Sequence, residues 1–344
     1  MKVGYVYDPV YLRHDTGQHV ENMRRLEAAM AYLEASGTKE QLNLLLPRPA
    51  TIAELAAVHE ERYIGQVKDF ADRGGGWLDP DTVVSPASYE VALYAAGGVI
   101  RAAEAVMKGE VDSAFALVRP PGHHATASNA MGFCLFNNIA VATRYALKEL
   151  GVERILIIDF DVHHGNGTQE AFYADPQVLY VSTHQSHHYP GTGYIEETGT
   201  GAGEGANMNI PLPAGCDDAE YQQVFDQIIR LVARRFQPQL IMVSAGYDAH
   251  WADGLASMLV TVTGFGEIVK SIRKLAEELC QGRLVIALEG GYHLEAQAAA
   301  VGATFDILRG RTLVRDTLGK PPRESTAPSV TSLVKEIRRI HGLE

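Results

Sequence analysis

The sequence is poor in cysteine, and its three cysteines, Cys134, Cys216 and Cys280, are widely separated. They are an odd number without any CxxC spacing, so they predict neither a disulfide framework nor a cysteine zinc site. Free thiols are typical of the reducing cytoplasm, and we therefore expect a cytoplasmic protein.

Long apolar runs and an excess of basic residues are also missing. No stretch reaches the roughly 18 consecutive apolar residues of a membrane helix, and Met1 leads into MKVGYVYD without a basic leader or cleavage site. The 30 basic and 42 acidic residues give a net charge of −12, the wrong sign for general nucleic-acid binding. We expect a soluble, unexported protein that binds neither a membrane nor nucleic acid directly.

Apolar runs and helical patterns alternate along the chain. Short runs rich in Val, Ile and Leu predict buried parallel strands at 2–7, 113–118, 154–160, 178–183, 240–245 and 283–289. Amphipathic patterns predict helices at 21–35, 88–109, 136–151, 218–236 and 264–280. This alternation indicates a single α/β domain with a doubly wound sheet.

The end of the chain differs in composition. Residues 319–329 resemble a linker, and the VTSLVKEIRRIHGL segment after them predicts a terminal amphipathic helix. We expect a main domain at 1–318, with 319–344 forming a linker and a helix docked on that domain.

Polar side chains follow five of the six predicted strands. Ligands of open α/β sheets bind at the carboxyl ends of the strands, so these segments are where we expect the site. They are RPPGHHA (119–125), DFDVHHGNGT (159–168), STHQSHHYPGTG (182–193), SAGYDAHWAD (244–253) and EGGYHLE (289–295).

Asp161 and His163 lie two residues apart after a strand, so an extended backbone turns both side chains the same way. Catalytic zinc needs a third protein ligand and an open position, and Asp248 is the natural third candidate. Each residue alone could be a helix cap or an ordinary loop residue. Their occurrence beside other reactive groups at neighbouring strand ends favours a metal site.

His123 and His124 follow a rigid Arg-Pro-Pro-Gly segment and are candidates for acid/base catalysis. An imidazole titrates near neutrality, so it can take a proton from a metal-bound water and return it to a leaving amine. Asp159 and Asn166 could orient the two rings, the carboxylate favouring a charged ring and the amide a neutral one. Tyr292 follows two glycines and could donate to an oxyanion, although a core tyrosine is the simpler interpretation of that residue alone.

These motifs together resemble the histone deacetylase and acetylpolyamine amidohydrolase superfamily, especially its class II branch. The resemblance runs from HDTGQHVENMRRL (14–26) through GFCLFNN (132–138), YPGTG (189–193) and AGYDAH (245–250) to LEGGYHL (288–294). It implies a single-domain, arginase-like α/β fold, with a central, mostly parallel sheet of about eight strands and helices on both faces. Residues 1–318 would then be the deacetylase catalytic domain.

The resemblance also implies roles for individual residues. One zinc ion per chain would be held by Asp161, His163 and Asp248, with His124 as general base and acid. His123 would assist electrostatically, Tyr292 would donate to the acetyl carbonyl, and Asp159 and Asn166 would be the partners of the histidines. The substrate channel would include Phe133, Tyr189, Leu255, Gly132 and Gly291, with Arg25 as the arginine of an internal acetate pocket. A structural potassium ion would be held by Asp159, Asp161, His163, Ser182 and Thr183.

The implied reaction is the hydrolysis of an N-acetyl amide to acetate and an amine. The substrate could be an acetyl-lysine protein, an acetylpolyamine or another acetylated amine, and the chain could form a homo-oligomer. Ferrous iron could replace zinc. An acidic residue that grips peptide substrates at the rim in many members has no evident counterpart around VVSPAS (83–88).

Two other functions are compatible with parts of the pattern. A ureohydrolase-like enzyme would need two manganese ions and more carboxylate ligands than this sequence offers at the strand ends. A catalytically silent protein that binds an acylated ligand for regulation would not need to retain His124 and Tyr292. We expect His184, His187 and His188 to be solvated residues at the rim, and we assign no role to His250 or His293.

Overall fold

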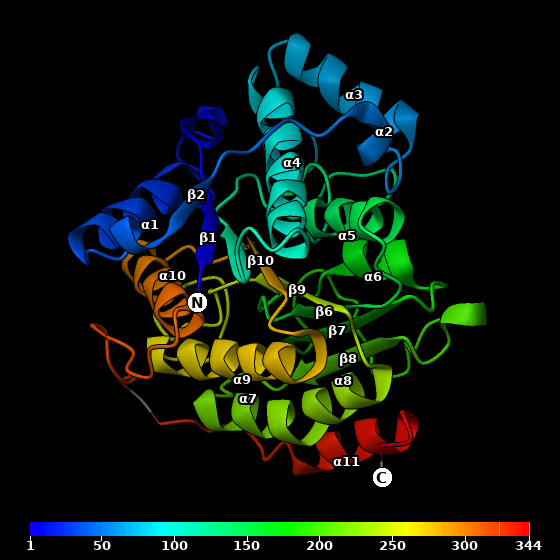
Figure 1. Ribbon diagram of the computed structural model, residues 1–344, viewed down its shortest axis with the longest axis vertical. Helices are drawn as coiled ribbons and strands as arrows, with labels where there is room; N and C mark the ends of the chain where they lie inside the picture. Colours follow the sequence, from blue (N-terminus) through cyan, green and yellow to red (C-terminus); the bar gives the residue numbers. More distant parts are fainter. Residues whose placement is uncertain (323, 344) are drawn as a thin grey trace.

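In the computed structural model, which describes residues 1–322 and 324–343, eight strands form one sheet (Figure 1). The strand order is β2-β1-β5-β10-β9-β6-β7-β8, and every neighbouring pair is parallel. The strands are β1 (Val3–Val6), β2 (Asn43–Leu45), β5 (Ser113–Ala116), β6 (Ile155–Asp159), β7 (Val178–Gln185), β8 (Asn207–Leu212), β9 (Leu240–Ala245) and β10 (Leu284–Leu288). A separate short antiparallel pair is formed by β3 (Gly76–Trp77) and β4 (Val83–Val84).

The central strands are buried along their whole length. β6 (ILIID), β9 (LIMVSA) and β10 (LVIAL) have no exposed residue, as expected for parallel strands that are covered on both faces. The main hydrophobic core therefore lies on both sides of this part of the sheet.

Helices cover the two faces in separate layers (Figure 1). The first layer consists of α1 (Arg24–Ala35), α10 (Leu294–Leu308), α9 (Val262–Cys280) and the continuous rod of α7 (Asp218–Val224), the π-helical turn η4 (Phe225–Ile229) and α8 (Arg230–Phe236). The second consists of α4 (Ser88–Met107) and α5 (Asn138–Glu149), with α2 (Ile52–Leu55), α3 (Glu61–Asp72) and α6 (Asn166–Phe172) beside them. Short 3-10 turns are η1 (Pro9–Arg13), η2 (Lys39–Gln41) and η3 (Gly201–Gly203). This architecture confirms the predicted fold class.

The last helix, α11 (Thr331–Ile340), lies beside α7 and α8 (Figure 1). It contacts η4 and buries Val334 and Ile337. The division of the chain at residue 318 stays a prediction. Among the helices of residues 1–322 and 324–343, none combines the length and apolar character that a membrane crossing requires.

The parallel arrangement brings the carboxyl ends of β5, β6, β9 and β10 to one edge of the sheet. These strands are adjacent in the order β5-β10-β9-β6. The loops that follow them carry the residues singled out by the sequence, so the topology gathers those residues in one place.

Candidate active site

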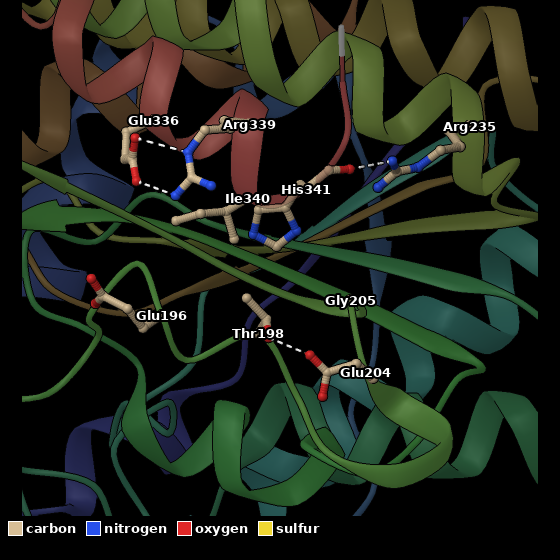
Figure 2. A pocket seen from close by; sticks show the side chains of 9 residues that line it. All are labelled: Glu196, Thr198, Glu204, Gly205, Arg235, Glu336, Arg339, Ile340 and His341. Atoms are coloured by element: carbon tan, nitrogen blue, oxygen red, sulfur yellow. Dashed lines mark hydrogen bonds and ion pairs between the residues drawn. The ribbon is translucent and has the colours of Figure 1, made fainter.

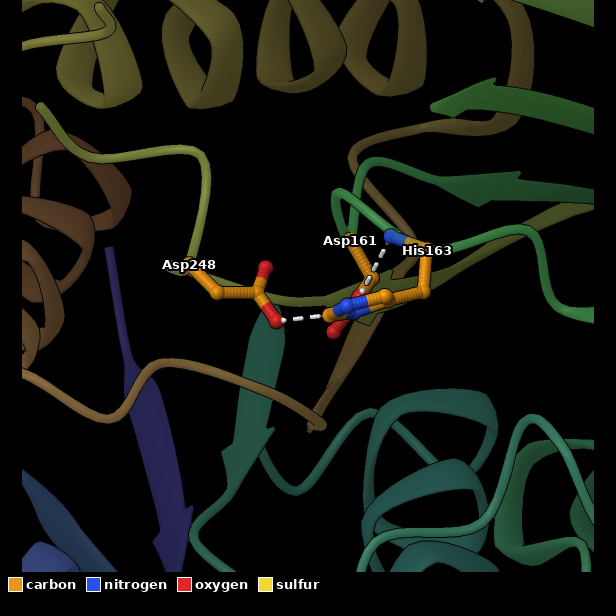
Figure 3. A group of neighbouring side chains, drawn as sticks. All are labelled: Asp161, His163 and Asp248. Atoms are coloured by element: carbon orange, nitrogen blue, oxygen red, sulfur yellow. Dashed lines mark hydrogen bonds and ion pairs between the residues drawn. The ribbon is translucent and has the colours of Figure 1, made fainter. Parts of the chain in front are cut away.

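Asp161 and His163 lie in the loop after β6, and Asp248 lies in the loop after β9, the neighbouring strand. Their side chains point toward one another (Figure 3), and one potential ligand atom from each lies within 4.8 Å of the others. His163 Nδ1 is 3.1 Å from Asp161 Oδ1 and 3.2 Å from Asp248 Oδ2. Two carboxylates and one imidazole are a donor set that zinc accepts in catalytic sites.

The electrostatics of this group favour a bound cation. Asp248 Oδ2 is buried without a hydrogen-bond partner among the described residues. Burial and the nearby Asp161 carboxylate raise the pKa of Asp248 to about 6. Burial disfavours charge on His163, but the close carboxylates of Asp161 and Asp248 raise its pKa to about 10. The group is therefore short of positive charge, and a divalent cation would supply it.

Two glycines make room for the carboxylates. A side chain at Gly246 would overlap Asp161 Oδ2, and one at Gly290 would overlap the carboxylates of Asp248 and Asp161. The backbone N–H of Gly290 also donates to Asp161 Oδ2 at 2.8 Å. The first glycine of the Gly-Gly-Tyr motif thus lets the backbone approach the metal-ligating group closely.

His123 and His124 lie in the loop after β5, with ring centroids 4.0 Å apart. His123 Nδ1 is 3.1 Å from Asp159 Oδ2, and His124 Nδ1 is 2.8 Å from Asn166 Oδ1. Burial opposes charge on His123, but the carboxylates of Asp159 and Asp161 raise its pKa to about 10. Burial and the adjacent His123 hold the pKa of His124 well below its usual range. One ring is therefore charged and the other neutral.

A narrow pocket of about 190 Å³ reaches these residues. The pocket is lined by Asp81, His124, Gly132, Phe133, His163, His188, Tyr189, Leu255 and Tyr292. The Phe133 ring meets that of Tyr292 edge-on at 5.6 Å, and the Tyr189 ring meets that of His124 edge-on at 5.2 Å. The pocket thus has aromatic walls and joins a potential metal ligand, a neutral histidine and a tyrosine.

The sequence of residues 19–308 matches the histone deacetylase domain. The chain belongs to the histone deacetylase family. It is 42% identical to the histone deacetylase-like amidohydrolase of Pseudomonas aeruginosa, over 92% of this chain and 82% of that protein. It is 38% identical to histone deacetylase 14, chloroplastic, of Arabidopsis thaliana, over 96% of this chain and 83% of that protein. The crystal structure of the HDA15 HD domain superposes with a TM-score of 0.89 at 34% identity, covering 99% of this chain and 94% of that one.

Membership of this deacetylase family supports an enzyme that hydrolyses amides, and it agrees with the parallel α/β architecture described above. The pocket is accordingly the candidate active site of a deacetylase. Of the residues expected in the substrate channel, Gly132, Phe133, Tyr189 and Leu255 line it.

Arg25 and Gly291 lie next to Tyr292 and outside that lining. The Arg25 side chain is buried and donates to the carbonyl oxygens of Gly291, at 2.7 Å, and Glu289. It also donates to Glu21 at 3.1 Å, and its Cζ lies 4.8 Å from the centre of the Tyr292 ring. In this structure Arg25 supports the Tyr292 segment, and a role in binding acetate stays a prediction.

Asp81 is an acidic residue of the pocket lining that the sequence did not reveal. It lies two residues before the 83–88 segment, and its Oδ1 accepts from the N–H of Gly132 at 3.1 Å. The pocket therefore has an acidic residue two positions before the 83–88 segment, in which the sequence showed no evident counterpart of the acidic rim residue. The Asp-Pro-Asp-Thr sequence at 79–82 was the available signal, but only the fold shows that it faces the pocket.

Of the three histidines that the sequence predicted to be solvated, His187 is exposed, whereas His184 and His188 are not. His184 is only 2% exposed, because it is still part of β7 and lies between Ser182 Oγ and the carbonyl oxygen of Gly193. His188 lines the pocket, its ring stacked 5.1 Å from that of His163, and its Nε2 is 2.8 Å from the carbonyl oxygen of Leu255.

Glu289 is a fully buried carboxylate at the end of β10 that was also missed. It accepts from the N–H groups of Gly122 at 2.6 Å and His123 at 3.2 Å, and from Ser244 Oγ at 3.2 Å. It therefore joins the strand before Tyr292 to the segment that carries the two histidines. Its partners are mostly backbone groups, which cannot be recognised from the residue types in the sequence.

The residues expected to hold potassium lie together beside the site. Asp159 and Ser182 are paired across β6 and β7, and Thr183 Oγ1 is 3.5 Å from the carbonyl oxygen of Asp159. Asp159, Asp161, Ser182 and Thr183 are all buried.

A larger hollow of about 590 Å³ lies elsewhere, between the 196–205 loop and the end of α11 (Figure 2). Several of its charged groups have partners within the hollow, and Glu204, for example, accepts from Thr198 Oγ1. Arg339 pairs with Glu336, and Arg235 donates to the carbonyl oxygen of His341. None of the residues singled out by the sequence lines it.

Proposed function

We propose that this protein is a zinc-dependent deacetylase that hydrolyses an N-acetyl amide to acetate and a free amine. The observation that carries the proposal is a buried Asp-His-Asp group with an unpartnered carboxylate oxygen, whose His163 lines a narrow aromatic pocket. A neutral histidine and a tyrosine line the same pocket.

Asp161, His163 and Asp248 would hold one divalent cation per chain. Zinc, or ferrous iron in the same donor set, would supply Lewis-acid polarisation of the acetyl carbonyl and lower the pKa of the attacking water. The unpartnered oxygen of Asp248 and the two close carboxylates fit such an ion.

His124 would move the proton. The side-chain oxygen Oδ1 of Asn166 accepts from the Nδ1–H of His124, which leaves Nε2 as the acceptor atom of a neutral ring. That nitrogen can take the proton of the attacking water and later deliver it to the departing amine. The charged His123, held by Asp159, would stabilise the negative charge that develops beside it.

Tyr292 would donate a hydrogen bond to the acetyl oxygen as negative charge develops on it. Burial raises the pKa of Tyr292 well above its usual range, so the hydroxyl keeps its proton at neutral pH. Removing one oxyanion donor costs about 10²–10³ in kcat, so we expect that loss in Tyr292→Phe, with KM changed little. Steady-state acetate release checks this, and a near-normal kcat would contradict the role.

The pocket supports a substrate whose acetyl group sits at the end of a slender chain. An acetyl-lysine side chain, an acetylpolyamine or another acetylated alkylamine has that shape, and the net charge of −12 favours cationic amines over anionic ones. Structural potassium at Asp159, Asp161, His163, Ser182 and Thr183 and assembly into a homo-oligomer belong to the same proposal.

The test is acetate release by zinc-loaded protein from an acetyl-lysine peptide, acetylputrescine, acetylspermidine and an aryl-ethyl acetamide. A preference of about 10²-fold, or about 2.7 kcal/mol, would identify the substrate class. Failure to release acetate from any of them would favour the silent regulatory protein. Bound metal measured by mass spectrometry should be close to one zinc per chain, whereas two manganese ions would indicate ureohydrolase-like chemistry.

A further inference from the structure

Asp253 is a nearly buried carboxylate in the loop after β9, five residues beyond Asp248, and is 6% exposed. Its Oδ2 accepts from the N–H of Tyr292 at 2.6 Å and from the N–H of His293 at 2.9 Å. Its Oδ1 accepts from the N–H of Leu255 at 3.1 Å. One side chain thus joins the Tyr292 segment to the loop that forms the Leu255 wall of the pocket.

The connection continues around the pocket. The carbonyl oxygen of Leu255 is 2.8 Å from His188 Nε2, and the His188 ring stacks on that of His163. Tyr292, Leu255, His188 and His163 all line the pocket. Asp253 connects Tyr292 to the other three residues through hydrogen bonds, although it does not itself line the pocket.

Tyr292 needs such support because of its backbone. It follows Gly290 and Gly291, and Gly291 has a φ of +111°, so the preceding segment is flexible in the unfolded chain and unusual in the folded one. Arg25 holds the carbonyl oxygens of Glu289 and Gly291. Asp253 holds the N–H groups of Tyr292 and His293, so the segment is fixed through its acceptors on one side and its donors on the other.

We propose that Asp253 is a positioning residue that sets the Tyr292 hydroxyl relative to the channel wall, an inference that rests on the proposed role of Tyr292. Hydrogen bonds to a carboxylate are stronger than those between neutral groups, and the negative charge lies at the start of α10, where it is favourable. A small displacement of a group that donates to the reacting carbonyl can cost about 10²-fold in rate.

Asp253→Asn prevents the side chain from accepting hydrogen bonds from the Tyr292 segment and from Leu255 at the same time. Asparagine has a single acceptor oxygen, so it can serve either the Tyr292 and His293 N–H groups or the Leu255 N–H, but not both. We expect kcat to fall about 10- to 100-fold with KM within about 3-fold, measured by acetate release from an acetyl-lysine peptide. Hydrogen–deuterium exchange should become faster in the peptide 289–296.

A double-mutant cycle distinguishes positioning from a merely structural effect. If Asp253 acts through the Tyr292 hydroxyl, adding Asp253→Asn to Tyr292→Phe should lower kcat by less than about 3-fold further. A full, multiplicative loss in the double variant would overturn the proposal, as would a single variant with kcat within about 2-fold of the unchanged protein. If Asp253→Asn does not fold, Asp253→Glu, which displaces the carboxylate, is judged by the same criteria.

Asp218 provides the matched control. It accepts from the N–H of Thr261 at 2.8 Å and from Thr261 Oγ1 at 2.7 Å, and Thr261 is the N-cap residue immediately before α9. Asp218→Asn removes an equivalent helix-start carboxylate away from the pocket, so it should lower stability and leave kcat unchanged. An equal fall in kcat would show that the Asp253 effect is general destabilisation. A near-normal kcat in Tyr292→Phe would overturn the role of Tyr292 and, with it, the role of Asp253. A near-normal kcat in Asp253→Asn together with a low kcat in Tyr292→Phe would overturn the role of Asp253 alone.

Discussion

His123 and His124 are adjacent in the chain, but different groups face their Nδ1 atoms. Asp159 lies beside the first and Asn166 beside the second. The Asp159 and Asp161 carboxylates keep His123 charged, whereas burial and the adjacent His123 keep His124 neutral, so the two rings differ in charge.

The position of the His124 ring depends on a glycine. A Cβ at Gly132 would overlap the ring, and the φ of +56° is unfavourable for any other residue. We expect Gly132→Ala to lower kcat at least about 10²-fold by displacing His124. Acetate release measures the effect.

Gly109→Ala is the control for that variant. Gly109 has a similar φ of +70°, but a Cβ there would meet nothing within 4 Å. We expect about 1 kcal/mol of destabilisation without loss of kcat. Equal rates for the two variants would contradict the assignment of His124 to catalysis.

At the scale of elements, the sequence predicted the interior of the sheet better than its edges. All six predicted strands exist, because continuous apolar runs are typical of strands covered on both faces. The missed strands of this sheet are β2 and β8, at the two ends of the order, and the separate β3–β4 pair was missed as well. β2 has three residues, two of them exposed, and β8 places Asn207 and Asn209 among its apolar residues, so neither has a continuous apolar run.

Supporting residues were missed for another reason. Asp81, Asp253 and Glu289 act mainly through backbone N–H groups of distant segments. Backbone groups are the same at every position, so their partners cannot be identified from residue type. The metal-ligating group and the histidines could be identified from the sequence because their own side chains have the chemical properties that the site needs.

His59 links elements through a neutral ring. It lies between α2 and α3, with Nδ1 2.8 Å from the carbonyl oxygen of Thr126, and Nε2 accepts from the N–H of Asn137 at 2.9 Å, just before α5. Burial lowers its pKa to about 4. Because the folded pKa is below the unfolded value, its contribution to stability is present above about pH 6.5 and is lost as the pH falls toward 4.

We predict that the difference in unfolding free energy between the unchanged protein and His59→Gln depends on pH, because glutamine cannot titrate. From pH 7 to pH 5, the advantage in unfolding free energy of the unchanged protein should shrink by about 2 kcal/mol. Urea unfolding at both pH values measures it. A difference that does not change with pH would show that His59 is not held neutral by the fold.

At the scale of the whole molecule, the motifs are spread from residue 14 to residue 294, and only the completed sheet brings them together. Because these motifs occur in order along most of the chain, the family and the fold could be predicted from the sequence. The substrate could not, because the rim combines side chains from several loops, such as Asp81, His188 and Leu255.

The buried carboxylates should also make global stability depend on metal. Asp161 and Asp248 are each 1% exposed, and a cation between them removes their repulsion. Zinc at about 100 times its Kd should stabilise the fold by about 2.7 kcal/mol and raise the Tm by about 4 °C over chelator-treated protein. His163→Ala, which lacks one ligand, should show a much smaller shift, and an equal shift in that variant would place the metal elsewhere.

The most direct test of the central claim is acetate release from an acetyl-lysine peptide and acetylputrescine while zinc is titrated into metal-free protein. We predict that the rate on at least one of these substrates rises with bound zinc and levels off at about one ion per chain. A rate independent of zinc, a plateau only at two ions per chain, or no acetate from either substrate would contradict it.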